Sequence, residues 1–372
     1  MKDTLCVMLA AGGTGGHLFP AFALAEELQR RGVAVDLMTD MRGDRYGSGF
    51  PARNVYKVPA ATLTGRSPLA AARTAMSLAS GTRAAYAILR KVRPSAIIGF
   101  GGYPTFPPLV AARLLRVPSA IHEQNAVLGR ANKMLARRVN AIATSFERTK
   151  YLDGGFGKAV CVTGNPVRQA VIEAAATSFR LPEAQGEVRL LIFGGSQGAR
   201  FFSDAVPAAL AALSTATRAR LRVVQQVRDE DLGRVRQSYA ESGVKSVVDT
   251  FFKDLPARMA SSHLVIGRAG ASTVAELTVI GRPALLVPLP HALDNDQLNN
   301  ALRLAESGGG WCIEQKDLTT QRLTAEIDNL IAQPQKLAAA AEAAKRAGRP
   351  DAVARLADFV LNLAAFSGPR AA

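Results

Sequence analysis

Short apolar runs alternate with longer amphipathic stretches along most of the chain, and each run is apolar at nearly successive positions. In the first half these runs cover residues 5–10, 34–39, 96–100, 119–121 and 141–144. In the second half they cover residues 189–193, 221–226, 264–267 and 284–287. Continuous apolar runs are typical of strands that are buried on both faces of a parallel sheet. The pattern therefore predicts an α/β protein with two doubly wound, Rossmann-like domains.

The length of the chain and two turn-rich breaks indicate where the domains divide. A chain of 372 residues is long enough for two cores of ordinary size. Pro166 restricts the residue before it, so residues 164–168 are the predicted linker. A second break, Gly348-Arg349-Pro350, precedes a helical stretch. We expect an N-terminal domain over residues 1–163, a C-terminal domain over 169–347, and a C-terminal helix within 350–366 that packs back on the N-terminal domain.

Two glycine-rich loops follow apolar runs in opposite halves of the chain. Residues 11–17 read AGGTGGH and residues 193–199 read FGGSQGA. A strand that turns through glycines into a helix directs backbone N–H groups and the helix dipole at one point, where phosphate is the usual ligand. Leu18 stands where a dinucleotide fingerprint needs its third glycine, so the first loop does not favour NAD(P) binding.

His17 closes the first loop at the mouth of a predicted helix, with Pro20 in the first turn. The helix dipole disfavours an imidazolium there, and a neutral imidazole is able to take a proton from a hydroxyl. The alternative is a histidine that only hydrogen-bonds the backbone or a bound phosphate. The sequence leaves both interpretations open.

Polar clusters also follow two later strands of the first half. Residues 101–104 read GGYP after one strand, and residues 122–125 read HEQN after the next. Ligands of open α/β sheets bind beyond the carboxyl ends of the strands, so both clusters are directed at the same crevice as the first loop. The alternative is that His122 and Glu123 cap the following helix or pair with each other.

The second half places small and polar residues after its later strands. Residues 268–273 read RAGAST, and Glu276 follows in the ensuing helix, where a carboxylate is able to accept hydrogen bonds from a ribose diol. Residues 294–300 read DNDQLNN, whose amides and acids suit sugar hydroxyls. The alternative there is an ordinary helix cap at Asp294 or Asn295. No sequence feature requires a metal ion.

Positive charge is concentrated in the first domain. Residues 1–165 carry 22 Lys and Arg against 9 Asp and Glu, a net charge of +13, whereas residues 166–372 carry 24 against 21. No acid occurs between Asp44 and Glu123. Within that interval apolar residues are interspersed with Arg66, Arg73, Arg83 and Arg90, and Met76 lies between them. This composition suits in-plane contact with an anionic membrane surface; the alternative is a core helix with solvated arginines.

Other function classes fit less well. Only 6% of the residues are aromatic and no nucleic-acid-binding motif is present, so nucleic acid is not an expected partner. Cys6, Cys161 and Cys312 lie far apart, which argues against disulfides and zinc and favours a reduced, cytoplasmic protein. The apolar start runs directly into the first glycine loop and is expected to be a strand rather than a signal peptide. No segment is long and apolar enough to predict a membrane span.

Taken together, these motifs resemble the MurG family of bacterial cell-wall glycosyltransferases. Seven stretches match in order, at residues 12–17, 101–103, 122–125, 164–168, 194–199, 268–276 and 296–301. The resemblance implies the GT-B architecture, in which two domains face each other across a cleft. It also implies transfer of N-acetylglucosamine from UDP-N-acetylglucosamine to undecaprenyl-pyrophosphoryl-MurNAc-pentapeptide, with inversion at the anomeric carbon. No metal or other cofactor is implied, since UDP-N-acetylglucosamine is itself a substrate.

The resemblance also implies roles for individual residues. His17 would be the catalytic base. Acceptor contacts are expected at Gly13, Tyr103, His122 and Glu123. The expected donor-binding residues are Thr14, Gly15, Gly16, Asn125, Arg168, Gly195, Ser196, Gln197, Phe252, Ala271, Ser272, Thr273, Glu276, Asp296, Gln297 and Asn300. Two of these depart from the family's pattern, since Asp296 replaces an uncharged side chain and Phe252 an aliphatic one at the uracil, where only its backbone would act.

The expected partners are the UDP-sugar, the lipid-linked acceptor, an anionic inner-leaflet surface, and other cell-wall synthesis and division proteins. The implied location is peripheral, at the cytoplasmic face of the bacterial inner membrane, with contact through Arg66, Arg73, Met76, Arg83 and Arg90. A relative with another acceptor and the UDP-N-acetylglucosamine 2-epimerase share the implied architecture and remain alternatives. An NAD(P)-dependent dehydrogenase is a more distant one.

Overall fold

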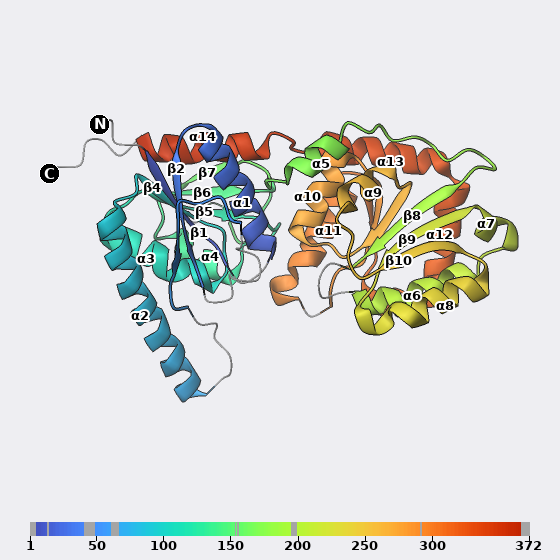
Figure 1. The fold of residues 1–372 in the computed structure, drawn as a ribbon, viewed down its shortest axis with the longest axis horizontal. Helices are drawn as coiled ribbons and strands as arrows, with labels where there is room; N and C mark the ends of the chain where they lie inside the picture. The colour runs from blue at the N-terminus through green and yellow to red at the C-terminus, as the bar shows by residue number, and fades with distance from the viewer. Residues whose placement is uncertain are drawn as a thin grey trace. The chain divides into compact units, whose positions relative to one another are not determined.

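The structure is a computed structural model of the full chain. It describes residues 5–12, 15–40, 49–60, 67–152, 154, 156–194, 199–290 and 292–365. The chain folds as two compact units, which we call unit 1 (residues 1–168 and 350–372) and unit 2 (residues 169–349), shown in Figure 1.

Unit 1 is built on a parallel sheet. In the described part of the chain its strands follow the order β3-β2-β1-β4-β5-β6-β7. They are β1 (Cys6–Ala10), β2 (Ala34–Thr39), β3 (Asn54–Lys57), β4 (Ala96–Gly99), β5 (Ser119–Glu123), β6 (Ala141–Thr144) and β7 (Ala159–Val162). Every pairing is parallel, so the carboxyl ends of all these strands meet at one edge of the sheet.

Helices cover both faces of this sheet. They are α1 (Gly15–Arg30), α2 (Pro68–Val92), α3 (Phe106–Leu114), α4 (Arg130–Ala136) and α14 (Ala352–Ala365), with a short 3-10 turn, η2 (Tyr103–Thr105). Alternate residues of β1 point to opposite faces. Val7 and Leu9 join a core with α1 and α14, whereas Met8 and Ala10 join a core with α2, α3 and α4. The sheet is therefore buried on both sides, as continuous apolar strands require.

The C-terminal helix α14 belongs to unit 1 and lies beside α1, as Figure 1 shows. Leu356 and Val360 are fully buried in the core that α1 and the sheet share. Arg31, just after α1, forms an ion pair with Asp358. The end of the chain therefore completes a core that its first strand begins.

Helix α2 has one buried side and one exposed side. Ser67 caps its start by accepting a hydrogen bond from the backbone N–H of Ala70 at 3.2 Å. A Cβ at Gly81 would lie 2.0 Å from the carbonyl oxygen of Pro59, so only glycine allows the helix to pack this closely. Within the described ranges, no helix combines the length and the apolar character that crossing a bilayer requires.

Unit 2 is built on a second parallel sheet. Its described strands follow the order β10-β9-β8-β11-β12-β13. They are β8 (Val188–Phe193), β9 (Leu221–Gln226), β10 (Lys245–Asp249), β11 (Leu264–Gly267), β12 (Ala284–Leu286) and β13 (Gly310–Cys312). Again all pairings are parallel. Consequently the segments that follow β8, β11 and β12 share one edge.

The helices of unit 2 also lie on both faces of its sheet. They are α5 (Gln169–Ala174), α6 (Ala199–Ala211), α7 (Thr215–Arg220), α8 (Leu232–Ser242), α9 (Leu255–Ser261), α10 (Ala271–Ile280), α11 (Asp296–Glu306), α12 (Thr320–Ala332) and α13 (Pro334–Ala347), with the 3-10 turns η3 (Asp229–Asp231), η4 (Leu293–Asn295) and η5 (Gln315–Asp317). One core joins Phe202 of α6, Tyr239 of α8 and Ile327 of α12 to the sheet. On the other side α10 contacts α13, α5 and α9.

Every strand expected from the apolar runs is present, with ends that differ by at most two residues. The largest difference is at β5, which continues through Glu123 instead of ending at Ile121. Four further strands, β3, β7, β10 and β13, were not expected. They are the outermost strands of the two described sheets.

Candidate functional site

The first glycine loop positions His17 at the carboxyl end of β1 in unit 1. The loop leads directly into α1, and His17 is the third residue of that helix. Its Nδ1 lies 3.3 Å from the carbonyl oxygen of Gly12. Because a carbonyl only accepts, Nδ1 carries the proton in this contact and Nε2 keeps the lone pair.

The imidazole of His17 also lies against the loop that follows β4. Gly101 and Gly102 have φ of 87° and 73°, a left-handed conformation that favours glycine. A Cβ on either residue would approach the His17 ring to 3.3 Å. Burial lowers the pKa of His17 below its usual value, so the ring is neutral at pH 7. A neutral ring with its lone pair on Nε2 has the protonation state of a general base.

Gly15 and Gly16 precede His17 in the chain, and Tyr103 follows the two glycines that lie against its ring. Gly15 and Gly16 open α1, and a Cβ on Gly15 would lie 2.9 Å from the ring of Phe19. Tyr103 begins η2 directly after the two glycines and is partly exposed. The residues Gly15, Gly16 and Tyr103, which are expected to contact the sugar donor or the acceptor, therefore lie at one edge of the unit 1 sheet.

His122, at the carboxyl end of β5, is completely buried and has internal partners. Its Nδ1 lies 3.0 Å from the side-chain Nε2 of Gln124, which only donates. Its Nε2 must therefore carry the proton, which it donates to the carbonyl oxygen of Gly164 at 3.0 Å. Burial lowers the pKa of His122 to about 4. The side chain thus ties the end of β5 to the predicted linker.

Glu123 is also buried, and it organises the segment that follows β5. Its carboxylate accepts hydrogen bonds from the backbone and side chain of Asn125 at 3.0 and 3.2 Å. It further accepts from the backbone N–H of Gly129 at 2.9 Å and from Asn132 Nδ2 at 2.8 Å. Gly129 is the residue that caps α4. The alternative that Glu123 supports the following helix is therefore seen in the structure, and Asn125 is held half-exposed by it.

Arg168 and Asn165 lie in the segment that ends unit 1. The Arg168 guanidinium carbon lies 5.5 Å from the ring centre of Phe19, on α1. Asn165 is only 5% exposed, and neither of its side-chain amide atoms has a hydrogen-bond partner among the described residues. Arg168 therefore projects toward the start of α1, the helix that carries His17.

In unit 2, Gln297 on α11 is held by two backbone amides. Its Oε1 accepts from the N–H of Leu289, after β12, at 3.0 Å and from that of Ala269, after β11, at 3.3 Å. Fully buried Asn300, one turn later, donates from Nδ2 to the Ala269 carbonyl at 3.1 Å. These contacts leave the Nε2 amino group of Gln297 as the end that is able to donate to a ligand.

The start of α10 follows β11 at the same edge. Ala271, Ser272 and Thr273 form its first turn and are partly exposed. The cap residue Gly270 provides no side chain, so the first backbone N–H groups have no side-chain cap. Glu276, one turn further, is 8% exposed. Backbone N–H groups at the start of α10 and the Glu276 carboxylate one turn away thus lie where a phosphate and a ribose were expected to bind.

Asp296 begins α11 in a strained segment. The two residues before it, Asp294 and Asn295, have φ of 59° and 53°. Asp296 Oδ1 accepts from the N–H of Gln297 at 2.7 Å. Asn295 occupies the cap position of α11 but makes no side-chain cap hydrogen bond. Burial raises the pKa of Asp296, and the charge of Asp294 contributes.

Phe252, which follows β10, is 8% exposed. The guanidinium carbon of Arg258 on α9 lies 4.4 Å from its ring centre. Its side chain is thus packed within unit 2. This position agrees with a role through the backbone alone.

Arg268 is a residue of this site for which the sequence analysis expected no role. Its guanidinium donates to the carbonyls of Val287 and Pro288 at 3.1 and 3.0 Å and to Gln315 Oε1 at 2.6 Å. It therefore joins the segments after β11 and β12 to η5. The sequence signal that could have identified Arg268 is a charged residue placed directly after an apolar strand.

Several predicted site residues lie outside the described ranges. They are Gly13, Thr14, Arg66, Gly195, Ser196 and Gln197. The expected end of the C-terminal helix, residue 366, also lies outside them.

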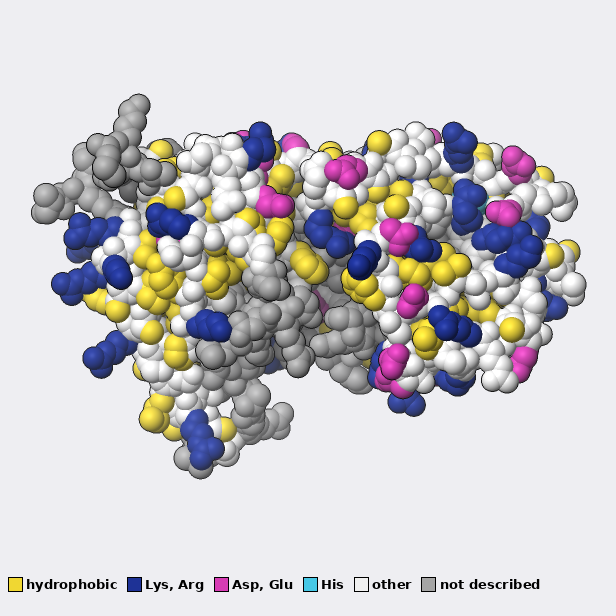
Figure 2. Space-filling model, in the orientation of Figure 1, with side chains coloured by type: hydrophobic (Ala, Val, Ile, Leu, Met, Phe, Trp, Pro, Cys, Tyr) yellow, Lys and Arg dark blue, Asp and Glu magenta, His cyan; other side chains and the backbone are white. Residues whose placement is uncertain are grey.

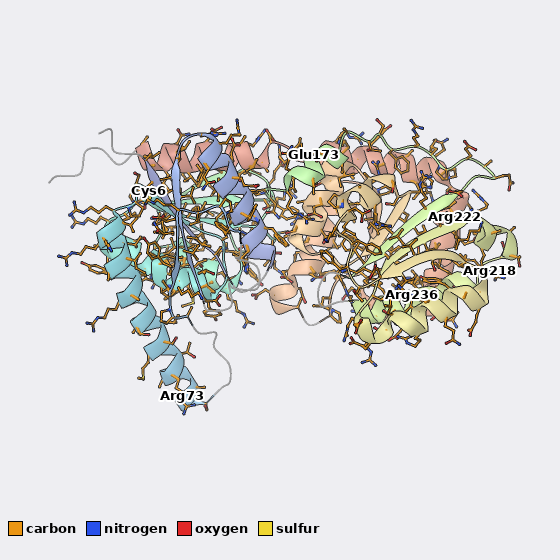
Figure 3. The ribbon with its side chains drawn as sticks, in the orientation of Figure 1. Cys6, Arg73, Glu173, Arg218, Arg222 and Arg236 are labelled. Atoms are coloured by element: carbon orange, nitrogen blue, oxygen red, sulfur yellow. The ribbon has the colours of Figure 1, made fainter. Side chains whose placement is uncertain are left out.

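The predicted membrane residues lie on the exposed side of α2. Arg73, Met76, Arg83 and Arg90 are exposed, with Met76 at 72%. At 100° per residue they fall on one side of the helix, opposite buried Ala85 and Leu89. Figure 2 shows basic and apolar side chains without acidic ones along this helix, and Figure 3 places Arg73 at its outer end. The helix therefore has a basic exposed side and an apolar buried side, and membrane contact through the exposed side stays a prediction.

Two family models match most of the chain. The glycosyltransferase family 28 N-terminal domain matches residues 7–144, and the glycosyltransferase family 28 C-terminal domain matches residues 189–356. The two matches lie in unit 1 and mainly in unit 2, respectively.

Close relatives match over nearly the full length. A Rhodopseudomonas palustris (strain BisB18) protein named UDP-N-acetylglucosamine--N-acetylmuramyl-(pentapeptide) pyrophosphoryl-undecaprenol N-acetylglucosamine transferase is 53% identical over 361 residues, covering 97% of this chain and 96% of that protein. A protein of the same name from Nitrobacter hamburgensis is 50% identical over 99% of this chain and 100% of its own length. The crystal structure of Acinetobacter baumannii MurG superposes with a TM-score of 0.78 at 29% identity, covering 96% of this chain and 99% of that one. Together with the two parallel-sheet units, these likenesses confirm the predicted GT-B fold class.

Proposed function

Since the chain belongs to glycosyltransferase family 28, we propose that it transfers N-acetylglucosamine from UDP-N-acetylglucosamine to the muramyl sugar of undecaprenyl-pyrophosphoryl-MurNAc-pentapeptide. The observation that carries this conclusion is 53% identity, over 97% of the chain, to a relative named for that reaction. The protein is an N-acetylglucosaminyltransferase of peptidoglycan synthesis that converts lipid I to lipid II.

Unit 2 binds the donor in this proposal. The uncapped start of α10 receives the pyrophosphate, and Glu276 accepts from the ribose hydroxyls. The Nε2 amino group of Gln297 donates to the transferred sugar because its oxygen is engaged by Leu289 and Ala269. Asn300 and Arg268 act as positioning residues, since each holds backbone near this end of the sheet.

Unit 1 binds the acceptor and supplies the base. Nε2 of His17 takes the proton of the acceptor hydroxyl as that oxygen bonds to the anomeric carbon, and the bond to UDP breaks. The supporting observations are the contact from Nδ1 to Gly12 and the lowered pKa. Gly101 and Gly102 keep the ring in place, with Tyr103 beside them for the acceptor. His122 and Glu123 act indirectly, because their hydrogen bonds position the linker and the segment that follows β5.

The departing UDP carries negative charge, which the protein must stabilise. Arg168, beside Phe19, and the helix dipole after the second glycine loop are suited to this task. We therefore propose that the reaction proceeds without a metal.

The exposed side of α2 binds the anionic face of the membrane that holds the lipid-linked acceptor. Exposed arginines and Met76 meet the requirement of charge attraction combined with apolar insertion. In this proposal the enzyme acts peripherally at the cytoplasmic face of the membrane, where it meets other cell-wall synthesis and division proteins.

Release of UDP from UDP-N-acetylglucosamine tests the function. The purified protein is incubated in EDTA with and without a short-chain lipid-linked MurNAc-pentapeptide. Release that depends on the acceptor is expected. Release of UDP and free sugar without acceptor would instead indicate an epimerase or a hydrolase, and a requirement for added metal would contradict the proposed electrostatics.

A further inference from the structure

Unit 2 contains a hollow at the amino ends of three neighbouring strands, far from the segments discussed above. Arg189 is the second residue of β8, His263 directly precedes β11, and Arg282 lies two residues before β12. The hollow has a volume of about 440 Å³. Its lining includes Ser178, Arg180, Arg189, His263 and Arg282.

This hollow is strongly basic. Three arginines line it, and no carboxylate is among its lining residues. The acid nearest to Arg189 in sequence, Glu187, is paired with Arg222 at 2.8 Å. Glu173, which Figure 3 labels on α5, is exposed and does not line the hollow. The positive charge therefore has no local counter-charge from the lining.

Arg282 is a buried cation whose hydrogen bonds all go to backbone carbonyls, with the ring centre of Phe179 5.6 Å from its guanidinium carbon. Its guanidinium donates to the carbonyls of Thr177, Ala260, Ile280 and Gly281. Burial lowers its pKa to about 10, with a contribution from the charge of Arg189. Since at this pKa the group still carries its charge at pH 7, a positive potential is fixed in the wall of the hollow.

Arg189 Nε donates to the Ser261 carbonyl at 2.6 Å, whereas Arg189 Nη2 and His263 Nε2 face each other. The backbone N–H of Arg189 donates to His263 Nδ1 at 3.1 Å, so Nε2 of the neutral ring carries the proton. That Nε2 lies 2.9 Å from Nη2 of Arg189, which also only donates. His263 is 3% exposed and forms part of the wall of the hollow. An oxyanion that accepts from both groups would satisfy them.

We propose that this hollow binds a phosphate group, either as inorganic phosphate or as the phosphate of a small monoester. His263 Nε2 and Arg189 Nη2 are its inner donors, and Arg282 adds the fixed charge behind them. Arg180 and Ser178 are exposed at the mouth, and neither has a hydrogen bond or ion pair within the described residues. A dianion with several acceptor oxygens matches this set of donors better than a halide or a carboxylate.

The proposed phosphate site is separate from the donor site. The proposed donor residues follow the carboxyl ends of β11 and β12, whereas the hollow lies at their amino ends and at that of β8. A strand of six residues, such as β8, spans roughly 20 Å. One UDP molecule bound beyond α10 would not fill both places.

Isothermal titration calorimetry on the full chain tests the proposal, with chloride replaced by phosphate, sulfate or glycerol 3-phosphate at constant ionic strength. Phosphate is expected to bind with one site per chain and to raise the melting temperature. Arg180→Gln and His263→Asn should each weaken binding by about tenfold, because each removes one charge-assisted or buried donor. Asn keeps an oxygen where Nδ1 accepts from Arg189.

The control variant is Arg346→Gln, which removes another exposed charge from unit 2, on α13. It should leave phosphate binding unchanged. Tighter binding of glycerol 3-phosphate would identify a monoester as the ligand, and equal binding would identify inorganic phosphate. Absence of binding, equal weakening in the control, or competition between phosphate and UDP would overturn the proposal. A donor-site failure would leave phosphate binding intact, so the two proposals fail separately.

Discussion

The chemistry of His17 and His122 is set by the group that each ring nitrogen faces. Next to a carbonyl, Nδ1 of His17 carries the proton and leaves Nε2 as the basic atom. Next to a Gln124 amide, Nδ1 of His122 accepts and Nε2 donates. The sequence treated both as candidates for contact with the reacting groups. Only their hydrogen-bond partners distinguish His17, the proposed base, from His122, which holds the end of β5 in place.

Replacing His17 by Gln should abolish most turnover, because the amide has no basic nitrogen. We expect kcat to fall by about 10²–10⁴-fold while the affinity for UDP stays within about twofold. Steady-state kinetics with a soluble lipid I analogue, together with UDP titration, provide the measurement. Because burial lowers the pKa of His17 below 6.5, the wild-type enzyme should lose activity only below that pH. Unimpaired turnover in the variant would assign the base elsewhere.

Gln297→Glu tests whether the side-chain amino group of Gln297 donates a hydrogen bond to the transferred sugar. The carboxylate keeps oxygen acceptors for the N–H groups of Leu289 and Ala269 but loses the amino group proposed to donate to the sugar. We expect the KM for UDP-N-acetylglucosamine to rise about tenfold with an unchanged melting temperature. A KM equal to that of the wild type would remove Gln297 from the sugar site.

His122 should make stability depend on pH in a defined window. Its pKa is about 4 in the folded protein and near 6.5 when unfolded, so the unfolded chain binds the extra proton between these values. The free energy of unfolding is therefore retained above pH 6.5 and declines as pH falls toward 4, by about 3 kcal/mol from this group. Denaturation of His122→Gln at several pH values should show a shallower slope than the wild type. Parallel slopes would contradict the assignment.

At the scale of elements, burial explains which strands the apolar pattern predicted. Strands inside the sheets, such as β1 and β11, are buried at every position and read as continuous apolar runs. The unexpected strands β3, β7 and β10 lie at sheet edges and are exposed at most positions. An edge strand has only one neighbour and needs less apolar surface, so its sequence carries a weaker signal.

Helix α2 has a buried apolar side and an exposed basic side, and reversing the charge of the exposed side tests its proposed contact with the membrane. We expect Arg73→Glu with Arg83→Glu to weaken binding to vesicles that contain phosphatidylglycerol by at least about tenfold, since each basic residue contributes about 1 kcal/mol near an anionic surface. Activity on a soluble acceptor analogue should change little. Vesicle sedimentation and the two activity assays provide the measurement.

The matched control is Arg322→Glu with Arg346→Glu, which changes the net charge equally on α12 and α13 of unit 2. Vesicle binding should be retained in this variant. If both pairs weaken binding to the same extent, net charge rather than α2 directs the protein to the membrane.

At the scale of the whole molecule, each unit has its own core, and unit 1 includes the end of the chain. Leu356 of α14 is fully buried in unit 1, and Leu337 of α13 is fully buried in unit 2. Their positions in sequence are close, although their cores are separate. The two units are therefore expected to respond separately to core substitutions.

We expect Leu356→Ala to lower the stability of unit 1 and Leu337→Ala that of unit 2, each by about 2–5 kcal/mol. Differential scanning calorimetry, with UDP added to raise the transition of the donor-binding unit, distinguishes the two. A single transition that both substitutions lower equally would show that the units unfold together.

The sequence by itself determined the fold class, the strands of the sheet interiors and the family, because these follow from local polarity and from motif spacing. Glycine loops and strand-end clusters are likewise local signals. The tertiary structure alone decided the edge strands, the partners of His122 and Glu123, and the residues that α14 covers in unit 1. It also assembled the basic hollow, whose arginines and histidine are spread over residues 180–282. Such features depend on which side chains meet after folding, and this information is absent from the order of residues along any one segment.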